Sequence, residues 1–128
     1  MDLGDKSSIL IVDDQLGVRQ LLYEALKDDY QNVFLAGSGV EAITKVEEHK
    51  PDLVIMDMKM PRMNGIEVME NMSKMGYRCP VIMMTAYGEL EVISQATQMG
   101  IKSYITKPFD LKELKQLIKD TLNDEKER

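Results

Sequence analysis

The chain has 128 residues, of which 44% are apolar and 30% charged, a composition typical of a globular domain. Twenty-two acidic residues against sixteen basic ones give a net charge of −6, which argues against non-specific binding of nucleic acid. No apolar run approaches the roughly 20 residues that span a bilayer, and the amino terminus lacks the pattern of a signal peptide. A lone cysteine, Cys79, cannot form an internal disulfide, which fits a cytoplasmic protein. The negative charge and the lack of a long apolar run lead us to expect no nucleic-acid partner and no membrane partner.

Five apolar segments alternate with five helical patterns along the chain. Short apolar runs predict strands over residues 8–12, 32–36, 52–57, 80–84 and 101–105. Apolar residues at helical spacing predict helices within residues 18–26, 38–49, 64–72, 90–100 and 110–122. Residues 1–7 are expected to be a frayed arm, and residues 123–128 a solvated tail.

Side-chain chemistry marks where several of these helices begin and end. Ser38 and Glu41 form a capping-box pattern at the start of the second helix. Gly100 is well placed as the carboxyl-terminal cap of the fourth helix. Apolar residues at helical spacing make the first helix one-sided: Val18, Leu21, Leu22, Ala25 and Leu26.

The alternation of strands and helices predicts an α/β fold, with helices on both faces of a parallel sheet and right-handed crossovers. The first, third and fourth strands are apolar throughout and should be central, while the short second strand and the alternating fifth strand should be edges. This pattern predicts a doubly wound sheet with strand order 2-1-3-4-5. We expect a single domain over residues 1–128, with its core within about 8–122.

Polar side chains follow four of the strands at the edge of the sheet where parallel strands place ligands. They are Asp13 and Asp14, Asp57, Thr85 and Lys107. Two carboxylates about 4 Å apart repel by on the order of 4 kcal/mol at an effective dielectric of 20, so a cluster of three calls for a cation. Oxygen ligands without nearby histidine or cysteine select a hard ion, Mg²⁺ first and Mn²⁺ as an alternative.

Magnesium beside a carboxylate, a hydroxyl and an ammonium is the equipment for phosphoryl transfer. Asp57 is the expected nucleophile, which would form an aspartyl phosphate. Asp13 and Asp14 would hold the metal, directly or through water. The hydroxyl of Thr85 and the ammonium of Lys107 would contact phosphoryl oxygens. Each residue has an ordinary explanation at a strand end, but their joint occurrence favours a functional site.

Four segments resemble the signature of the receiver domains of two-component response regulators: Asp13-Asp14, Asp57-Met58-Lys59-Met60-Pro61, Thr85-Ala86 and Lys107-Pro108-Phe109. The resemblance covers about residues 8 to 122 and implies a flavodoxin-like receiver fold. It implies phosphorylation of Asp57 by a sensor histidine kinase, with Mg²⁺ bound by Asp14, Asp57 and the backbone carbonyl of Lys59. It also implies a cis peptide bond before Pro108, and a switch pair formed by Thr85 and Tyr104.

Three segments are similar, more narrowly, to stand-alone receivers that act as intermediates of a sporulation phosphorelay: residues 13–19, 84–90 and 107–110. Such receivers take a phosphoryl group from a sensor histidine kinase and pass it to a downstream histidine phosphotransferase. Leu16 departs from them by replacing a tyrosine, and Tyr104 by replacing a histidine. The only histidine, His49, lies near a predicted helix end, so the phosphoryl donor must be a partner.

The first helix carries more apolar residues than can all face inward, which indicates a surface for a partner helix. We expect this docking surface to comprise six residues: Gln15, Leu16, Val18, Leu22, Gly88 and Pro108. The protein itself is expected to be a monomer.

Alternative functions remain open on the sequence alone. One is a binding switch of the chemotaxis type, whose phosphorylated surface recruits a target, and Tyr104 favours it. Another is a receiver that belongs to a longer transcription regulator. A phosphatase of the haloacid dehalogenase type is disfavoured, because Lys59 stands where its second acid is needed. Enzymatic activity is expected only in the limited sense of Mg²⁺-dependent phosphorylation and dephosphorylation of Asp57.

Overall fold

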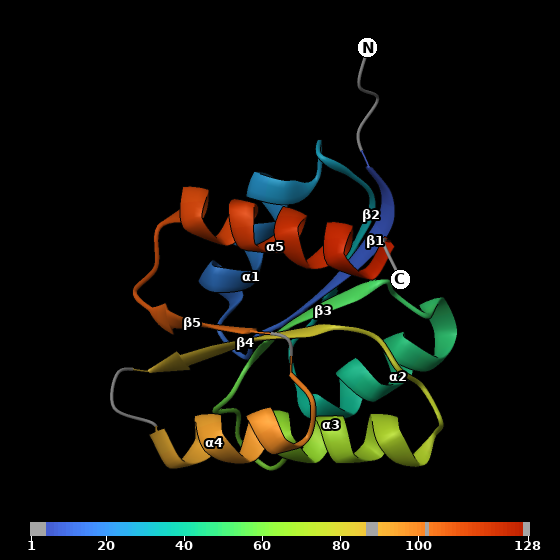
Figure 1. The fold of residues 1–128 in the computed structure, drawn as a ribbon, viewed down its shortest axis with the longest axis vertical. Helices are drawn as coiled ribbons and strands as arrows, with labels where there is room; N and C mark the ends of the chain where they lie inside the picture. Colours follow the sequence, from blue (N-terminus) through green and yellow to red (C-terminus); the bar gives the residue numbers. More distant parts are fainter. Residues whose placement is uncertain (1–4, 87–89, 102, 127–128) are drawn as a thin grey trace.

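The computed structural model describes residues 5–86, 90–101 and 103–126. Its strands are β1 (Asp5–Val12), β2 (Tyr30–Ala36), β3 (Leu53–Asp57), β4 (Val81–Ala86) and β5 (Ser103–Lys107). Its helices are α1 (Leu16–Leu26), α2 (Gly39–His49), α3 (Gly65–Lys74), α4 (Leu90–Gln98) and α5 (Leu111–Lys126). The five strands form one parallel sheet in the order β2-β1-β3-β4-β5, which confirms the predicted doubly wound fold (Figure 1).

Helices cover the sheet on both faces, with α1 and α5 on one side and α2, α3 and α4 on the other (Figure 1). Successive residues of β1 point to opposite faces, as in any strand. Ile9 and Ile11 therefore pack with α1 and α5, whereas Leu10 and Val12 pack with α2 and α3. Within the described part of the chain, no helix combines the length and apolarity needed to cross a bilayer.

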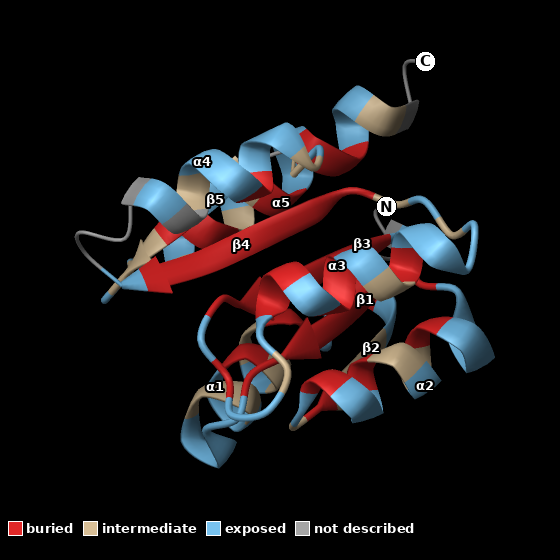
Figure 2. Cartoon of the chain, turned by 90° about the horizontal axis from the view of Figure 1, so that it is seen from below, coloured by how far each residue is buried: buried red, intermediate tan, exposed pale blue. Residues whose placement is uncertain are grey.

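The central strands are buried and the edge strands are partly exposed, as predicted. All residues of β3 are buried, and in β4 only Ala86 is exposed (Figure 2). β2 and β5 mix buried and exposed positions. The register pairs Val12 with Met56, Asp57 with Met84, and Ala86 with Lys107. The carboxyl ends of four strands therefore meet at one edge of the sheet.

Side chains close the amino-terminal ends of α2 and α3. The Ser38 hydroxyl accepts a hydrogen bond from the Glu41 backbone at 3.1 Å, which confirms the predicted cap. The Glu41 carboxylate, however, accepts from the backbone N–H of Gly37, one residue before the cap. Asn64 and Glu67 form a reciprocal capping box at the start of α3, with distances of 2.9 and 3.0 Å. These caps fix the two loops that precede α2 and α3.

The predicted boundaries at both ends of the chain were wrong. β1 already begins at Asp5, which pairs with Tyr30, so residues 5–7 are no frayed arm. α5 continues through Lys126, because the polar residues after Leu122 are compatible with a helix and carry no stop signal. Gly100 has a φ of 97°, which suits the predicted cap after α4.

The predicted fourth and fifth strands were shifted toward the amino terminus. β4 spans residues 81–86 rather than 80–84, and β5 spans 103–107 rather than 101–105. Polarity at Thr85 and Lys107 had been read as the end of each strand, although both residues continue the parallel pairing. The correction matters for function, because it makes these two polar side chains part of the sheet itself.

Candidate functional site

Three carboxylates meet at the carboxyl edge of the sheet. Asp13 follows β1 and Asp57 ends β3, and these two strands are direct neighbours. Asp13, Asp14 and Asp57 each offer an oxygen within 4.8 Å of the others. Asp13 and Asp57 are buried, whereas Asp14 is exposed. The predicted convergence of the acids is confirmed, and it leaves one side of the cluster open to solvent.

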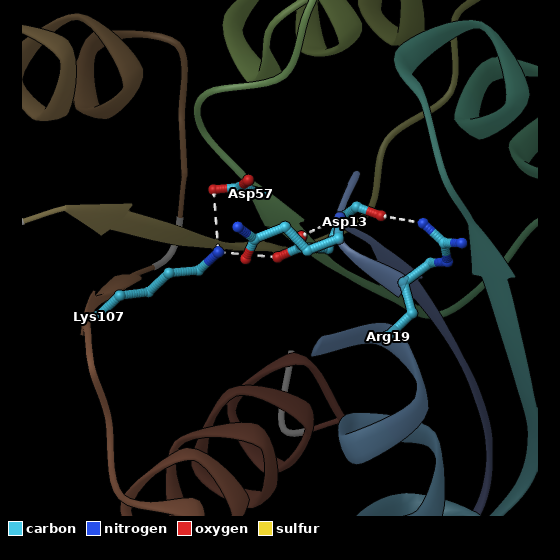
Figure 3. A network of polar contacts seen from close by, with 5 residues as sticks. Asp13, Arg19, Asp57 and Lys107 are labelled. Carbon is cyan, nitrogen blue, oxygen red and sulfur yellow. Dashed lines mark hydrogen bonds and ion pairs between the residues drawn. The ribbon is translucent and has the colours of Figure 1, made fainter. Parts of the chain in front are cut away.

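The ammonium of Lys107 lies between two of these acids. Its Nζ atom is 2.8 Å from Oδ2 of Asp13 and 3.4 Å from Oδ1 of Asp57 (Figure 3). Burial disfavours the ammonium, but the hydrogen bond to Asp13 and the charges of both acids prevail and raise the pKa of Lys107. The lysine therefore stays charged. The Lys107–Pro108 peptide bond is cis, as the resemblance implied.

The pKa of the Asp57 carboxyl group lies well above the usual value for an aspartate. Burial raises the pKa of Asp57 from 3.8 to about 6, and the negative charges of Asp13 and Asp14 act in the same direction. Lys107 opposes this shift through its charge and hydrogen bond, without cancelling it. A buried acid beside two others is stabilised in its ionised form by a bound cation. The donor set, carboxylate oxygens alone, fits a hard divalent ion such as Mg²⁺.

Thr85 adds a buried hydroxyl near the carboxyl end of β4. The Thr85 side chain is 1% exposed, and its Oγ1 atom has no hydrogen-bond partner among the residues that the structure describes. Burying a hydroxyl without a partner costs free energy, so such a group is unusual unless a ligand satisfies it. Because Met84 pairs with Asp57, Thr85 stands one residue beyond the level of the acid. The carboxyl end of β4 thus carries a buried donor suited to an anionic oxygen, with no partner among the described residues.

Every polar group of Asp13, in its backbone and its side chain, makes a hydrogen bond. Its backbone N–H donates to the carbonyl of Ala36 at 3.1 Å, and its Oδ1 atom accepts from the N–H of Gln15 at 2.8 Å. Its Oδ2 atom bonds Lys107, and its carbonyl accepts from Nη1 of Arg19 at 2.7 Å (Figure 3). Arg19 had no predicted role. The available signal was its position in the first helix, soon after the paired acids.

The predicted docking surface was wrong at Leu22. This residue is 0% exposed and packs with the core under α1 and α5. Leu21, which was not assigned to the docking surface, is 53% exposed instead. Leu16, which was predicted to face solvent, is 61% exposed. The apolar positions exceed the width of the buried stripe, and the sequence does not say which of two adjacent leucines is left outside.

The other predicted docking residues are distributed as follows. Gln15 and Pro108 are exposed on the two loops that flank the acidic cluster. Val18 is half-buried and packs against the core. Gly88 lies outside the described residues. Exposed residues of the docking surface therefore lie on α1 and on the loops before α1 and after β5.

Tyr104 and Lys59 take positions compatible with their implied roles. Tyr104 is 47% exposed on the edge strand β5. It pairs with Met83, whereas Thr85 pairs with Thr106, so Tyr104 and Thr85 lie on the same side of adjacent strands. Lys59 is exposed in the loop after β3. Metal binding by its carbonyl, and switching by Thr85 and Tyr104, stay predictions.

Comparison with known proteins matches residues 9–119 to the family model described as response regulator receiver domain. Sporulation initiation phosphotransferase F of Bacillus subtilis strain 168 is 42% identical over 114 residues, which cover 89% of this chain and 92% of that protein. The chemotaxis protein CheY of the same strain is 37% identical over 116 residues, covering 90% and 97%. The solved structure of a CheY-like receiver domain protein from Methanospirillum hungatei is 31% identical with a TM-score of 0.89, covering 97% and 100%.

Proposed function

Because the chain belongs to the receiver-domain family of response regulators, we propose that it is a phosphorelay intermediate. It accepts a phosphoryl group on Asp57 from a sensor histidine kinase and passes it to a downstream histidine phosphotransferase. The observation that carries this proposal is the meeting of Asp57 with two further acids and an ammonium at the carboxyl edge of the sheet. Asp13 and Asp14 after β1, and Lys107 at the end of β5, thus lie around one nucleophile.

Asp57 is the nucleophile of the proposed transfer. A bond forms between its carboxylate oxygen and phosphorus while the bond between phosphorus and the imidazole nitrogen of the donor breaks. The electron pair of the broken bond stays on that nitrogen. A Mg²⁺ ion held by Asp13, Asp14 and Asp57, with the Lys59 carbonyl, would supply positive charge that offsets the phosphoryl oxygens. The second transfer, to the downstream histidine, runs through the same bond changes in reverse.

Lys107 and Thr85 stabilise the transferred group. The Lys107 ammonium already lies 3.4 Å from Oδ1 of Asp57, so a phosphoryl oxygen attached there comes within reach of the charge. The Thr85 hydroxyl is a buried donor with no partner among the described residues, and a phosphoryl oxygen would satisfy it. Both contacts gain strength when the group arrives, which is the condition for favouring the phosphorylated state.

The exposed face of α1 supports a protein partner that delivers the histidine. Leu16 and Leu21 are both more than half exposed. Gln15 and Pro108 lie exposed beside the acidic cluster. A partner helix that contacts Leu16 beside these two loops would bring a side chain close to Asp57 while burying apolar surface. The 42% identity to sporulation initiation phosphotransferase F supports a role in sporulation initiation.

A second candidate function is a phosphorylation-dependent binding switch. It is favoured by the exposure of Tyr104, at 47%, and by similarity to CheY of Bacillus subtilis over 97% of that protein. The two functions differ in what happens to the phosphoryl group. A relay intermediate returns it to a histidine, whereas a switch retains it and binds a target.

Phosphotransfer from candidate kinases, followed by addition of candidate histidine phosphotransferases, tests the proposal. We expect Mg²⁺-dependent label on the wild type and on Asp28→Asn, which alters an exposed acid away from the site. Asp57→Asn should carry no label. Label that moves on to a histidine phosphotransferase supports the relay. Label that stays while a target binds more tightly supports the switch, and label that persists on Asp57→Asn contradicts both.

A further inference from the structure

We infer that Arg19 is a positioning residue for the metal centre, which holds the loop between β1 and α1 in the conformation that binds the cation. The inference rests on the proposed function, because that function assigns the cation to Asp13 and Asp14 of this loop. Arg19 acts through the backbone of Asp13 and not through contact with the cation or the phosphoryl group.

The contact joins a helix to the loop that precedes it. Nη1 of Arg19 donates to the backbone carbonyl of Asp13 at 2.7 Å (Figure 3). A hydrogen bond from a guanidinium is charge-assisted and stronger than a bond between neutral groups. The carbonyl that it holds belongs to the peptide unit between Asp13 and Asp14. Fixing the plane of this unit fixes the N and Cα atoms of Asp14 and so restricts where its side chain can lie.

The guanidinium is seated against a glycine on a third chain segment. A Cβ atom added to Gly37 would lie 2.8 Å from Nη1 and 3.1 Å from Cζ of Arg19. Among the described glycines, positive φ angles occur at Gly76 and Gly100, so no such angle explains the glycine at position 37. Its role is to leave room for the guanidinium. The carbonyl of Ala36, the preceding residue, accepts a hydrogen bond from the N–H of Asp13 at 3.1 Å. The end of β2 and the Arg19 guanidinium therefore bind the backbone N–H and the carbonyl of Asp13, respectively.

This arrangement provides two independent ways to break one contact. Arg19→Met removes the donor and keeps the length of the apolar stem. Gly37→Ala keeps the arginine in the sequence, but its new Cβ atom displaces the flexible guanidinium end of Arg19 from the Asp13 carbonyl. Groups that orient metal ligands typically change metal affinity by about 10- to 100-fold when removed. We therefore expect each variant to raise the Mg²⁺ concentration at half-saturation about tenfold.

The experiment measures Mg²⁺ binding by chemical-shift titration and by the Mg²⁺-induced rise in unfolding temperature. It compares the wild type, Arg19→Met, Gly37→Ala and the double variant. Arg78→Met, an exposed arginine outside the site, is the matched control for the arginine. Gly17→Ala is the control for the glycine, because an added Cβ there meets nothing within 4 Å.

Each single variant should weaken Mg²⁺ binding about tenfold, and the double variant should be no weaker than either, because both changes break the same contact. Arg19→Lys, which keeps a donor, should recover part of the affinity. The metal-free unfolding temperature should stay within a few degrees of the wild type, which a purely stabilising role would not predict. Single variants that bind Mg²⁺ like the wild type, or whose effects add, would overturn the inference.

Failure of the proposed function gives a different result. In that case the wild type itself shows no Mg²⁺ titration of the loop, or Asp57→Asn accepts phosphoryl from acetyl phosphate as the wild type does. A wild type that binds Mg²⁺ and is labelled on Asp57, beside position 19 and 37 variants that match it in affinity, refutes the role of Arg19 alone.

Discussion

The ammonium of Lys107 lies 2.8 Å from Oδ2 of Asp13, across 94 residues of sequence. This ion pair places a fixed positive charge where the proposed function also requires a metal cation. Lysine and cation therefore share the negative charge of one cluster. The pair stabilises the metal-free fold, and it makes the cluster less attractive to a second cation than three isolated acids would be.

Lys107→Met tests this balance. It should destabilise the metal-free protein by about 2 kcal/mol, because Asp13 loses a charged hydrogen-bond partner. It should also tighten Mg²⁺ binding, since the competing charge is gone, yet slow phosphorylation of Asp57. Urea unfolding measures the stability, Mg²⁺ titration the affinity, and labelling by acetyl phosphate the rate of phosphorylation. Lys115→Met is the control, because the pair of Lys115 with Asp29 is 3.8 Å long and exposed, and its loss should change stability by less than about 1 kcal/mol.

The raised pKa of Asp57 predicts how stability depends on pH. Burial raises this pKa from 3.8 to about 6, so between these values the folded protein binds a proton that the unfolded chain does not. The ionised group therefore costs stability above pH 6, and the cost disappears as the pH falls toward 4. Asp57→Asn should stabilise the metal-free protein at pH 7.5 by up to about 3 kcal/mol.

Chemical unfolding of both proteins at several pH values checks this sign. The difference between Asp57→Asn and the wild type should shrink toward pH 4, while Asp28→Asn should show no such trend. Mg²⁺ should stabilise the wild type at pH 7.5 far more than at pH 5, where Asp57 is protonated and a poor ligand. A wild type that is as stable as Asp57→Asn at pH 7.5 without metal would contradict the expected shift.

Thr85 should separate stability from function. Its hydroxyl is buried and has no partner among the described residues, so Thr85→Val removes an unsatisfied group at nearly constant volume. We expect a change in the free energy of unfolding between zero and about 1 kcal/mol of stabilisation. Phosphorylation of Asp57 should slow at least several-fold, and Thr85→Ser should preserve it. Equal phosphorylation rates in Thr85→Val and the wild type would show that the hydroxyl takes no part in the proposed transfer.

Among the residues that the structure describes, two other than glycine have a positive φ angle. Lys50 has a φ of 46° at the carboxyl end of α2, and Arg62 has a φ of 71° in the loop after β3. Side chains with a Cβ pay roughly 1–2 kcal/mol in this region, whereas glycine does not. Lys50→Gly and Arg62→Gly should each stabilise the protein by about 1 kcal/mol in thermal or urea unfolding. Alanine at either position should give no gain, which separates backbone relief from loss of the long side chain.

Cys79 should be an unreactive thiol. Burial, above all, raises the pKa of Cys79 to about 12. Only the thiolate is nucleophilic, so reaction with a disulfide reagent at pH 8 should be at least about 100-fold slower than in the unfolded chain. Comparing the rates in buffer and in denaturant measures this protection. Rapid reaction of the native protein would show that the thiol is reached without unfolding.

The sequence allowed the strand order to be predicted, because continuous apolar runs distinguish buried strands from the edges. It also predicted the cluster of Asp13, Asp14 and Asp57, since parallel strands bring their carboxyl ends to one edge. Other features depend on exact rotation or on contacts between distant segments. Leu22 was assigned to the docking surface and Leu21 was not, because periodicity defines a stripe only to within about one residue.

Arg19 shows the second kind of limit. Its partner is a backbone carbonyl, and its seat is a glycine that follows another strand. Neither a backbone oxygen nor the absence of a side chain leaves a chemical mark in the sequence of α1. The contacts of Arg19 with the Asp13 carbonyl and with Gly37 are therefore found only in the three-dimensional structure.

The helix α1 presents Leu16 and Leu21 to solvent while its Arg19 reaches inward to Asp13. In the proposed function, one helix thus carries both the residues that contact a partner and the residue that holds the loop of the metal site. Substituting the two outward leucines should therefore change the binding of a partner protein and leave the ion chemistry at Asp57 as it is.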